Sequence, residues 1–281
     1  MTLDATAEVR KSWPLGLVIG AVLLASIVGL ALAAPYIAPF DPMRMAVGKR
    51  LAGPGFDHLF GTDEFGRDLF SRVLAGGRLS LGIGAAAVVS GLVIGGLIGL
   101  AAAFSGNVLR NLLLRVIDIL YSFPDILIAL SLVAFLGPGI ENATLAIAIS
   151  LVPFYARVAY GLAAAERVKP YIEAAQLAGI GHSRLIRVHV MPNITQSLIV
   201  MGTLGFSSAI LSAAGLSFLG LGVQPPSPEW GAILASGRNY ITKAPWLLLF
   251  PGLAIVLTVM SLNLIGDNLR DLVDPHRRGR P

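Results

Sequence analysis

Cysteine is absent from this sequence of 281 residues, and charged residues are scarce. Without cysteine the chain cannot use thiol catalysis, form disulfide bonds or hold a metal through thiolates. Charged side chains make up 13% of the residues, about half of the roughly 25% found in soluble domains, whereas hydrophobic residues make up 55%. The mean hydropathy of +0.77 agrees with this. A lipid bilayer is therefore the expected solvent for much of the chain.

The sequence also lacks the local patterns that mark common catalytic, nucleotide and metal sites. Its one Gly-Lys pair is Gly48-Lys49, and Met43 stands where a P-loop requires glycine. No HExxH pattern and no serine, histidine and aspartate arrangement occurs, and four histidines, at positions 58, 182, 189 and 276, are too scattered for a metal site. We therefore expect a chain that is not an enzyme, has no catalytic or metal-ligating residues and binds no cofactor itself.

Long apolar runs are the main positive feature. A bilayer core of about 30 Å needs roughly 20 apolar residues in a helix, and six runs meet that length: 15–36, 80–104, 116–136, 143–165, 195–221 and 246–265. Such runs must be helices, because backbone polar groups have to be satisfied within lipid. The expected fold class is all-α, a polytopic membrane protein with six transmembrane helices. A signal peptide is the alternative for the first run, but its apolar core exceeds the usual length of about 7–15 residues.

Lysine and arginine indicate the orientation of these runs. With the N-terminus inside, the inner segments hold 13 of these residues and the outer segments hold 8. Most of the outer ones lie in segment 37–79, which also carries five acidic residues. We therefore expect both termini in the cytoplasm. We attribute the net charge of +5 to orientation and to anionic lipid headgroups rather than to nucleic acid.

A comparatively polar segment, EAAQLAGIGHSRLIRVHVMPN (173–193), lies between the fourth and fifth runs. Pro170 suits the first turn of a helix, and Tyr171, Ala174, Ala175 and Ala178 then fall on one face at i, i+3, i+4 and i+7. This face consists mostly of methyl groups, so another surface can approach it closely. A lone helix of about ten residues is marginal in water. The spacing therefore fits two interpretations: a docking element without a partner in its own chain, or an ordinary polar loop with an incidental helix.

The ends of this short helix are marked as well. Glu173 lies in the first turn, where the helix dipole favours a carboxylate. Gly179 and Gly181 predict the end of the helix, since glycine adopts the positive φ that terminates one. Ser183 predicts the cap of a second short turn.

Small residues within the runs predict close packing. Gly91, Gly95 and Gly99 lie at intervals of four on one face of the second run, which favours a tight helix–helix contact. An interface that moves during function is the alternative.

Two acidic residues in the third run predict polar contacts within the membrane. Asp118 is expected to pair with Arg115, three residues away on the same helix. Asp125 lies deeper, and an acidic residue within a span is a functional candidate. The alternative for Asp125 is a structural pair, for which Arg157 has suitable chemistry.

Several blocks of the sequence resemble a known family. Glu173-Ala174-Ala175, three residues and then Gly179 resemble the EAA motif of permease subunits in bacterial binding-protein-dependent ABC importers. Histidine and methionine replace the usual aliphatic and leucine before the final proline of the motif, as in the dipeptide and oligopeptide branch. Longer blocks are similar to C-type permease subunits of that branch: 58–84, 115–130, 215–234, 244–255 and 263–275.

This resemblance implies a type I ABC importer permease fold in the bacterial inner membrane. Residues 1–79 would hold a tail, the first helix and an outer segment; 80–265 would form the transmembrane domain; and 266–281 would be a cytoplasmic tail. A coupling helix at about 169–183 would bind a separate ATPase through Glu173, Ala174, Ala175, Ala178 and Gly179.

The resemblance also implies partners. These are a homologous permease, two ATPases that bind ATP and magnesium, an extracytoplasmic solute-binding protein and a peptide substrate. For the outer loop 223–245, whose tryptophans suit the membrane interface, we expect anchoring there, with contact with the binding protein as the alternative.

The translocation pathway and the rival functions rest on fewer residues. Asp125, Ser208 and Ser212 are the candidate pathway residues, the two serines because the fifth run resembles a pathway wall. Simple packing of small residues is the alternative for them. Nickel and glutathione importers share this permease type. A proton-coupled secondary transporter that uses Asp125, and a membrane scaffold, are rivals from other classes.

Overall fold

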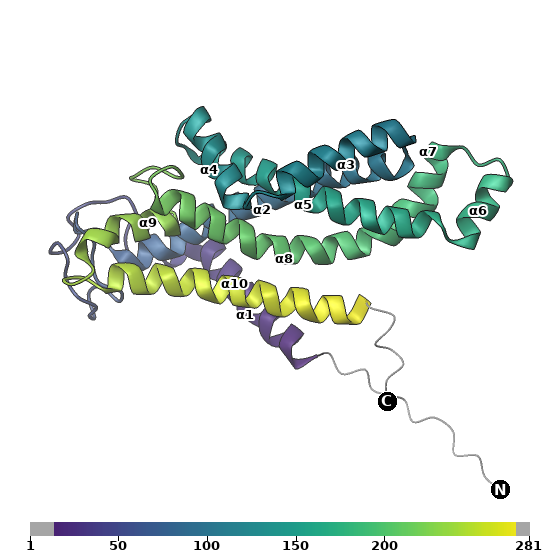
Figure 1. Ribbon diagram of the computed structural model, residues 1–281. Helices are drawn as coiled ribbons and strands as arrows, with labels where there is room; N and C mark the ends of the chain where they lie inside the picture. Colours follow the sequence, from purple (N-terminus) through teal and green to yellow (C-terminus); the bar gives the residue numbers. More distant parts are fainter. Residues whose placement is uncertain (1–13, 274–281) are drawn as a thin grey trace, which may run out of the picture.

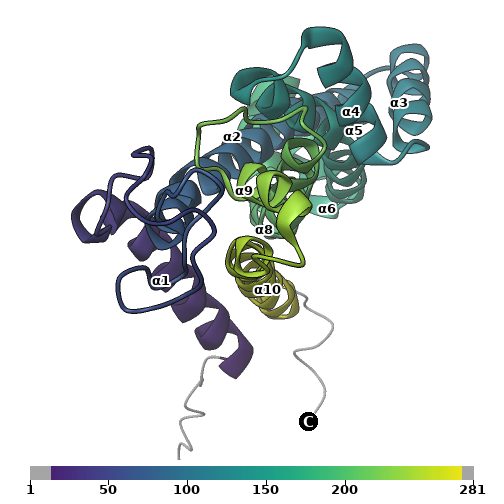
Figure 2. The same cartoon turned by 90° about the vertical axis from the view of Figure 1, so that its left-hand side faces the viewer.

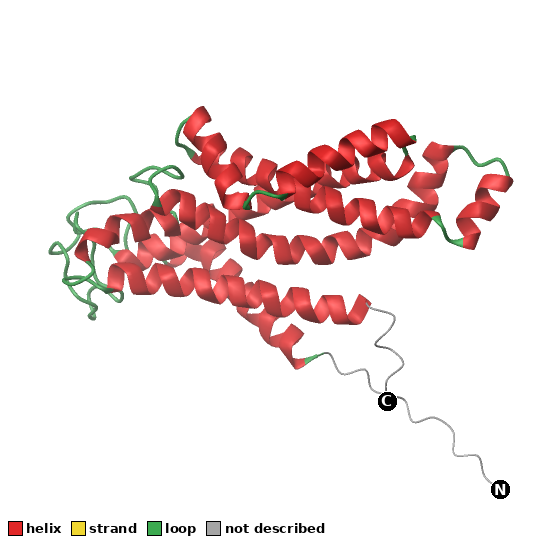
Figure 3. Cartoon of the chain, viewed as in Figure 1, coloured by secondary structure: helices red, strands yellow, loops and turns green. Residues whose placement is uncertain are grey.

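The computed structural model describes residues 14–273 and shows an elongated bundle of helices (Figure 1). No strand occurs within these residues (Figure 3), so the predicted all-α class is confirmed. In chain order the helices are α1 (Leu15–Ile37), α2 (Leu69–Phe104), α3 (Asn107–Tyr121), α4 (Asp125–Leu136), α5 (Ile140–Arg167), α6 (Pro170–Leu177), α7 (His182–Leu185), the π-helix η1 (Ile186–Val190), α8 (Met191–Phe218), α9 (Trp230–Gly237), the 3-10 helix η2 (Arg238–Tyr240) and α10 (Trp246–Val273).

Within the described residues, five helical runs are long and apolar enough to cross a membrane alone: α1, α2, α5, the run from α7 through α8, and α10. α3 and α4 pass the same test together but are bent by 89°. The prediction of one helix over 116–136 is therefore wrong. Pro124 explains the break, because it has no N–H to donate and disfavours helical backbone at Phe123 before it. Six spans result if the bent pair counts as one.

Two other helices extend beyond the predicted runs. α2 begins at Leu69 rather than at 80, because the Asp68 side chain accepts a hydrogen bond from the backbone N–H of Ser71 and caps the helix there. α10 continues to Val273 rather than ending at 265. The predicted boundaries at 79/80 and 265/266 both fall inside continuous helices, so neither marks a break in the structure.

The predicted glycine contact joins α2 to α5. A Cβ atom added to Gly91 would lie 2.9 Å from the carbonyl oxygen of Ala148, and one on Gly95 would lie 2.7 Å from that of Val152. A Cβ atom on Gly99 would lie closer still to the carbonyl oxygen of Ala156. The two helices can approach this closely only because these positions lack side chains, as in other small-residue contacts between membrane helices. The prediction of tight packing is confirmed.

The two ends of the bundle differ. α6, α7, the beginning of α1 and the end of α10 lie at one end, whereas the loop 38–68 and α9 lie at the other (Figure 1). Figure 2, seen from that second end, shows α1 and α10 on one side of the bundle and α3 and α4 on the other.

The loop 38–68 is built around buried charges. The Arg67 Nε atom donates to the Asp63 carboxylate at 2.6 Å, and the Arg72 Nε atom lies 3.6 Å from the same carboxylate. His58 Nδ1 lies 2.9 Å from the buried Asp68. Several basic residues of the outer segment are therefore held by its own acidic residues inside a packed loop.

Candidate functional site

The polar segment after α5 forms a short helix, a turn and then a long continuous helix. Pro170 occupies the first turn of α6, and Gly179 adopts φ +79° just beyond it, as predicted. Gly181 has an ordinary φ of −65° and precedes α7. Ser183 lies within α7 and provides no side-chain cap, so that prediction is wrong. From His182 the chain is helical without a break to Phe218.

α6 packs against other helices of its own chain, so the prediction that it has no packing partner within the chain is wrong. Ile172 is fully buried, and Ala175 packs beside it against the inner cluster, which we define as these buried residues: Leu100, Ala103, Ala163, Ile172, Leu185, Val190 and Ile194. Burying one isoleucine side chain contributes about 1.5–3 kcal/mol. This packing stabilises an eight-residue helix that would not persist in water.

The opposite face of α6 is exposed and largely apolar. Leu177 is 84% exposed, and we call the whole patch the α6 surface: Val168, Tyr171, Glu173, Ala174, Leu177 and Ala178. Of the four residues predicted to share the docking face, Ala175 instead belongs to the packed side. Leu177 and Val168 were missed, because the predicted face was chosen for small residues. Exposed hydrocarbon beside a carboxylate suits a protein partner.

A hydrogen-bonded brace fastens α6 to the helices on either side. Tyr171 donates its hydroxyl to the Glu166 carboxylate at the end of α5 and accepts a bond of 2.9 Å from Asn193 in α8. The Lys169 ammonium lies 2.6 Å from the other oxygen of Glu166. We call Tyr171, Glu166, Lys169 and Asn193 the brace. Desolvation, followed by the bond to Glu166, raises the pKa of Tyr171 to about 12, so this phenol stays protonated at neutral pH.

Sequence reasoning missed the brace for a physical reason. Tyr171 and Asn193 are 22 residues apart and are separated by a glycine turn and a π-helix, so no helical register connects them. The Pro192-Asn193 pair in the family motif was the one available signal. In the structure Pro192 lies at the start of α8, directly after the π turn.

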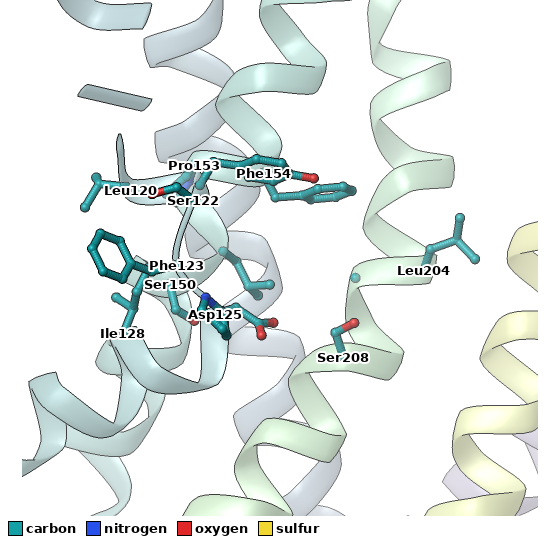
Figure 4. Close-up of a pocket in the computed structure, with 14 residues that line it drawn as sticks. Leu120, Ser122, Phe123, Asp125, Ile128, Ser150, Pro153, Phe154, Leu204 and Ser208 are labelled. Atoms are coloured by element: carbon teal, nitrogen blue, oxygen red, sulfur yellow. The ribbon is translucent and has the colours of Figure 1, made fainter. Parts of the chain in front are cut away.

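A second feature is a cavity of about 480 Å³ at the break between α3 and α4. Asp125 and Ser208 both line it and project into the space between α4 and α8 (Figure 4). The remaining walls come from the break itself and from α3, α4, α5 and α8, and include Ser122, Ile128, Ser150, Phe154 and Leu204. Ser212 is buried and does not line the cavity, so the pathway role predicted for it has no support from this geometry.

The predicted charge pairs are rearranged. The Arg157 Nη1 atom donates to the Asp118 carboxylate at 2.7 Å and joins α5 to α3. Asp118 was expected to pair with Arg115 on its own helix, and Arg157 was the candidate partner of Asp125. Asp125 instead accepts a bond from the adjacent backbone N–H of Ile126. The sequence could not rank these pairs, because Asp118 and Arg157 are 39 residues apart.

Comparison with known proteins places these features in a transport family. Residues 91–279 match the family described as "Binding-protein-dependent transport system inner membrane component". The di/tripeptide transport system permease protein DppC of Pseudomonas aeruginosa is 48% identical over 262 residues, which cover 91% of this chain and 86% of that protein. The dipeptide transport system permease protein DppC of Escherichia coli is 42% identical over 266 residues, covering 92% and 89%.

A solved structure confirms the fold. The inward-facing MetNI methionine ABC transporter aligns with a TM-score of 0.60 at 20% identity and covers 73% of this chain and 98% of that chain. The type I ABC importer permease fold implied by the sequence blocks is therefore confirmed, and so is the resemblance itself. The family match spans both α6 and the cavity beside Asp125. This chain belongs to the family of inner membrane components of binding-protein-dependent transport systems.

Proposed function

We propose that this chain is one of the transmembrane permease subunits of an ATP-driven importer of di- and oligopeptides. The observation that carries the proposal is the 48% identity to a di/tripeptide permease over 91% of the chain. Subunits of this family form the membrane component, and ATP hydrolysis belongs to separate subunits. ATP and magnesium therefore act on the partners of this chain, while the chain supplies part of the pathway and the contact that drives it.

The α6 surface is the proposed contact with an ATPase subunit. Its exposed leucine and alanines can enter an apolar cleft, and Glu173 adds one charged contact at the rim. Gly179 turns the chain away directly after the helix, which leaves this surface unobstructed. Glu173, Ala174, Ala178 and Gly179 keep the docking role expected from the sequence. Ala175 supports the helix from behind.

The brace is the proposed route by which ATPase movement reaches the spans. Tyr171 bonds to Glu166 on α5 and to Asn193 on α8, and Ile172 packs into the inner cluster between them. α6 is thereby attached to both helices rather than suspended on a loop. Because α5 and α8 also form walls of the cavity, a push on α6 would change the cavity itself.

The cavity is the proposed section of the translocation pathway. Asp125 and Ser208 would face the substrate there, whereas Ser212 would act only if the helices rearranged during transport. A homologous second permease would complete the pathway, because exposed apolar side chains of α3 and α4 need either lipid or protein to cover them. Leu112, Val116 and Phe135 are among these side chains.

We propose that the end of the bundle with α6 faces the cytoplasm. The bias of basic residues supports this orientation, and it also places the beginning of α1 and the end of α10 on that side. The loop 38–68 and the segment around α9 would then meet the extracytoplasmic binding protein. The buried ion pairs that Asp63 of this loop makes with Arg67 and Arg72 would give that partner a rigid surface.

The test is reconstitution with the homologous permease, the two ATPases and the binding protein in proteoliposomes. We expect dipeptide uptake that requires ATP and is insensitive to a protonophore. Uptake driven by a proton gradient without ATPases would instead support a secondary transporter that uses Asp125. Nickel and glutathione, supplied as competitors, distinguish the peptide importer from its relatives, because neither should displace the peptide.

A further inference from the structure

One ion pair between the spans is far more exposed than structural pairs in a membrane should be. Asp118 and Arg157 are 54% and 51% exposed, although both lie on helices with apolar surfaces, α3 and α5. Ionisable side chains within spans face the interior of a bundle or a water-filled space, because lipid solvates them poorly. The open side of this pair is therefore expected to face water or another subunit rather than acyl chains.

The pair adjoins the cavity already described. Asp118, Arg115 and Ser122 line an open groove along α3, and Ser122 also lines the cavity that holds Asp125. The groove and the cavity thus meet at the break between α3 and α4. Together they present the carboxylates of Asp118 and Asp125 and the guanidinium of Arg115. Arg157 lines neither surface and reaches the groove from α5 through its bond to Asp118.

The remaining walls of the cavity are mostly apolar, with Ile128, Leu151 and Phe154 among them. Its volume of about 480 Å³ lies within the roughly 300–1,000 Å³ typical of small-molecule sites. Charged groups at the margin and apolar walls suit a ligand with charged ends and variable side chains.

We propose that Arg157, Asp118 and Asp125 form a binding site for the charged termini of a short peptide during its passage. Arg157 would bind the peptide carboxylate, and Asp118 and Asp125 would bind its ammonium group. The inference rests on the proposed peptide function and assigns the recognised group, a zwitterionic backbone with both termini charged. Recognition of the termini leaves the peptide side chains in the apolar part of the cavity, so peptides of different sequence are accepted alike.

The existing ion pair makes this exchange physically reasonable. Arg157 donates to Asp118 through Nη1, and a guanidinium carries five N–H donors in a planar fork that also suits a second carboxylate. A peptide with both charged ends brings one carboxylate and one ammonium, so it can satisfy both members of the pair when it separates them. A peptide with one blocked end would leave one charge without its partner, which is unfavourable away from bulk water.

A single-thiol labelling experiment tests this site. Because the chain has no cysteine, Ser122→Cys introduces its only thiol, at the junction of groove and cavity. The assembled complex with its second permease and ATPases, but without binding protein, is placed in nanodiscs and treated with a water-soluble maleimide. Labelling of this chain is followed with and without dialanine, N-acetyl-dialanine and dialanine amide.

We expect dialanine to slow the labelling and both blocked peptides to protect much less. Arg157→Gln should raise the half-protecting dialanine concentration roughly tenfold or more. Arg157→Lys keeps the charge but loses the planar fork, so it should retain only part of the protection. The matched control is Arg110→Gln, because Arg110 bonds Asn107 within α3, whereas Arg157 bonds Asp118 of the proposed site. The labelling rate without peptide shows whether a variant has shifted α3.

Equal protection by all three peptides, undiminished protection in Arg157→Gln, or a thiol that is never labelled would each overturn this site. Failure of the proposed function would give a different result. In that case the complete complex with its binding protein would import no peptide. The labelling experiment would still show whether peptides with charged termini protect the thiol of Ser122→Cys from the maleimide.

Discussion

Replacing Tyr171 by phenylalanine removes the hydroxyl that joins three helices and keeps the ring in place. The variant loses the bond donated to Glu166 and the bond accepted from Asn193. A hydrogen bond to a charged group contributes about 1.5–3 kcal/mol and a neutral one about 0.5–1.5 kcal/mol. Glu166 keeps its ion pair with Lys169, so it is not left without a partner.

The expected loss is smaller than the sum of these values, because Tyr171 is 41% exposed and water can replace part of both bonds. We take about 1–2 kcal/mol for the attachment of α6 to α5 and α8, which corresponds to a factor of roughly 5–30 in the ratio of attached to detached α6. The hydrophobic contact of Ile172 remains. α6 should therefore stay folded and bind the ATPase, but transmit its movement less faithfully.

The assay is the number of peptides imported per ATP hydrolysed in proteoliposomes. Tyr171→Phe should lower this ratio severalfold while ATPase co-purification and ATP hydrolysis are retained. Tyr36→Phe is the matched control, since Tyr36 is 90% exposed at the end of α1, at the opposite end of the bundle. A normal ratio in Tyr171→Phe would refute the brace as the route of coupling.

The hydrogen bond between Tyr171 and Glu166 also predicts the pH range over which the attachment of α6 is retained. The pKa of Tyr171 is raised to about 12, compared with about 10 for an ordinary tyrosine. The protonated Tyr171 hydroxyl therefore stabilises the attachment of α6 fully below about pH 10, and this stabilisation is lost as pH rises through about 12. In an ultraviolet titration, the difference between the wild type and Tyr171→Phe should show a tyrosinate transition near pH 12. A difference transition near 10 would show that the hydroxyl is neither desolvated nor held by Glu166.

Three further predictions concern the turn, the helix contact and the cavity. Gly179→Val should weaken ATPase binding and import, because a β-branched residue at φ +79° is strained by about 1–2 kcal/mol. Gly181→Val is the control: position 181 has φ −65° and equally open space, so ATPase binding and import should be retained. Gly95→Leu should lower the amount of assembled permease by forcing α2 away from α5, whereas Gly96→Leu, at a position with nothing within 4 Å, should leave that amount unchanged. Equal amounts of the two variants in the membrane would contradict the contact. Asp125→Asn should lower the import rate with normal assembly, as measured by uptake and co-purification, and lost assembly would instead favour a structural role.

Hydropathy was sufficient to find the spans, because the demand for apolar length is a local property of the sequence. It did not find the bend at Pro124, since the run remains apolar on both sides of the break. It also placed the start of α2 too late, because residues 69–79 contain two polar residues, Ser71 and Arg72, that are buried against the loop 38–68 rather than exposed to lipid. Burial by protein is a tertiary property that a hydropathy window does not report.

The functional site was predicted in part. Gly179 was found because a positive φ after a short helix has a direct residue signal. The packed side of α6 was assigned wrongly at Ala175, because small size alone does not distinguish a docking face from a close internal contact. The brace and the Asp118–Arg157 pair were missed for a shared reason, namely that each joins residues brought together only by the packing of separate helices.

The most direct test of the account is a cross-link from the α6 surface to an ATPase subunit. Leu177→Cys and Tyr36→Cys each introduce the only thiol of the chain, and both positions are highly exposed, at opposite ends of the bundle. Each thiol is coupled to a benzophenone maleimide, and the assembled complex is then irradiated. The protein joined to this chain in the adduct is identified by mass spectrometry. The account predicts an ATPase adduct from position 177 and none from position 36. An ATPase adduct from position 36, with none from position 177, would contradict both the docking surface and the cytoplasmic orientation of α6.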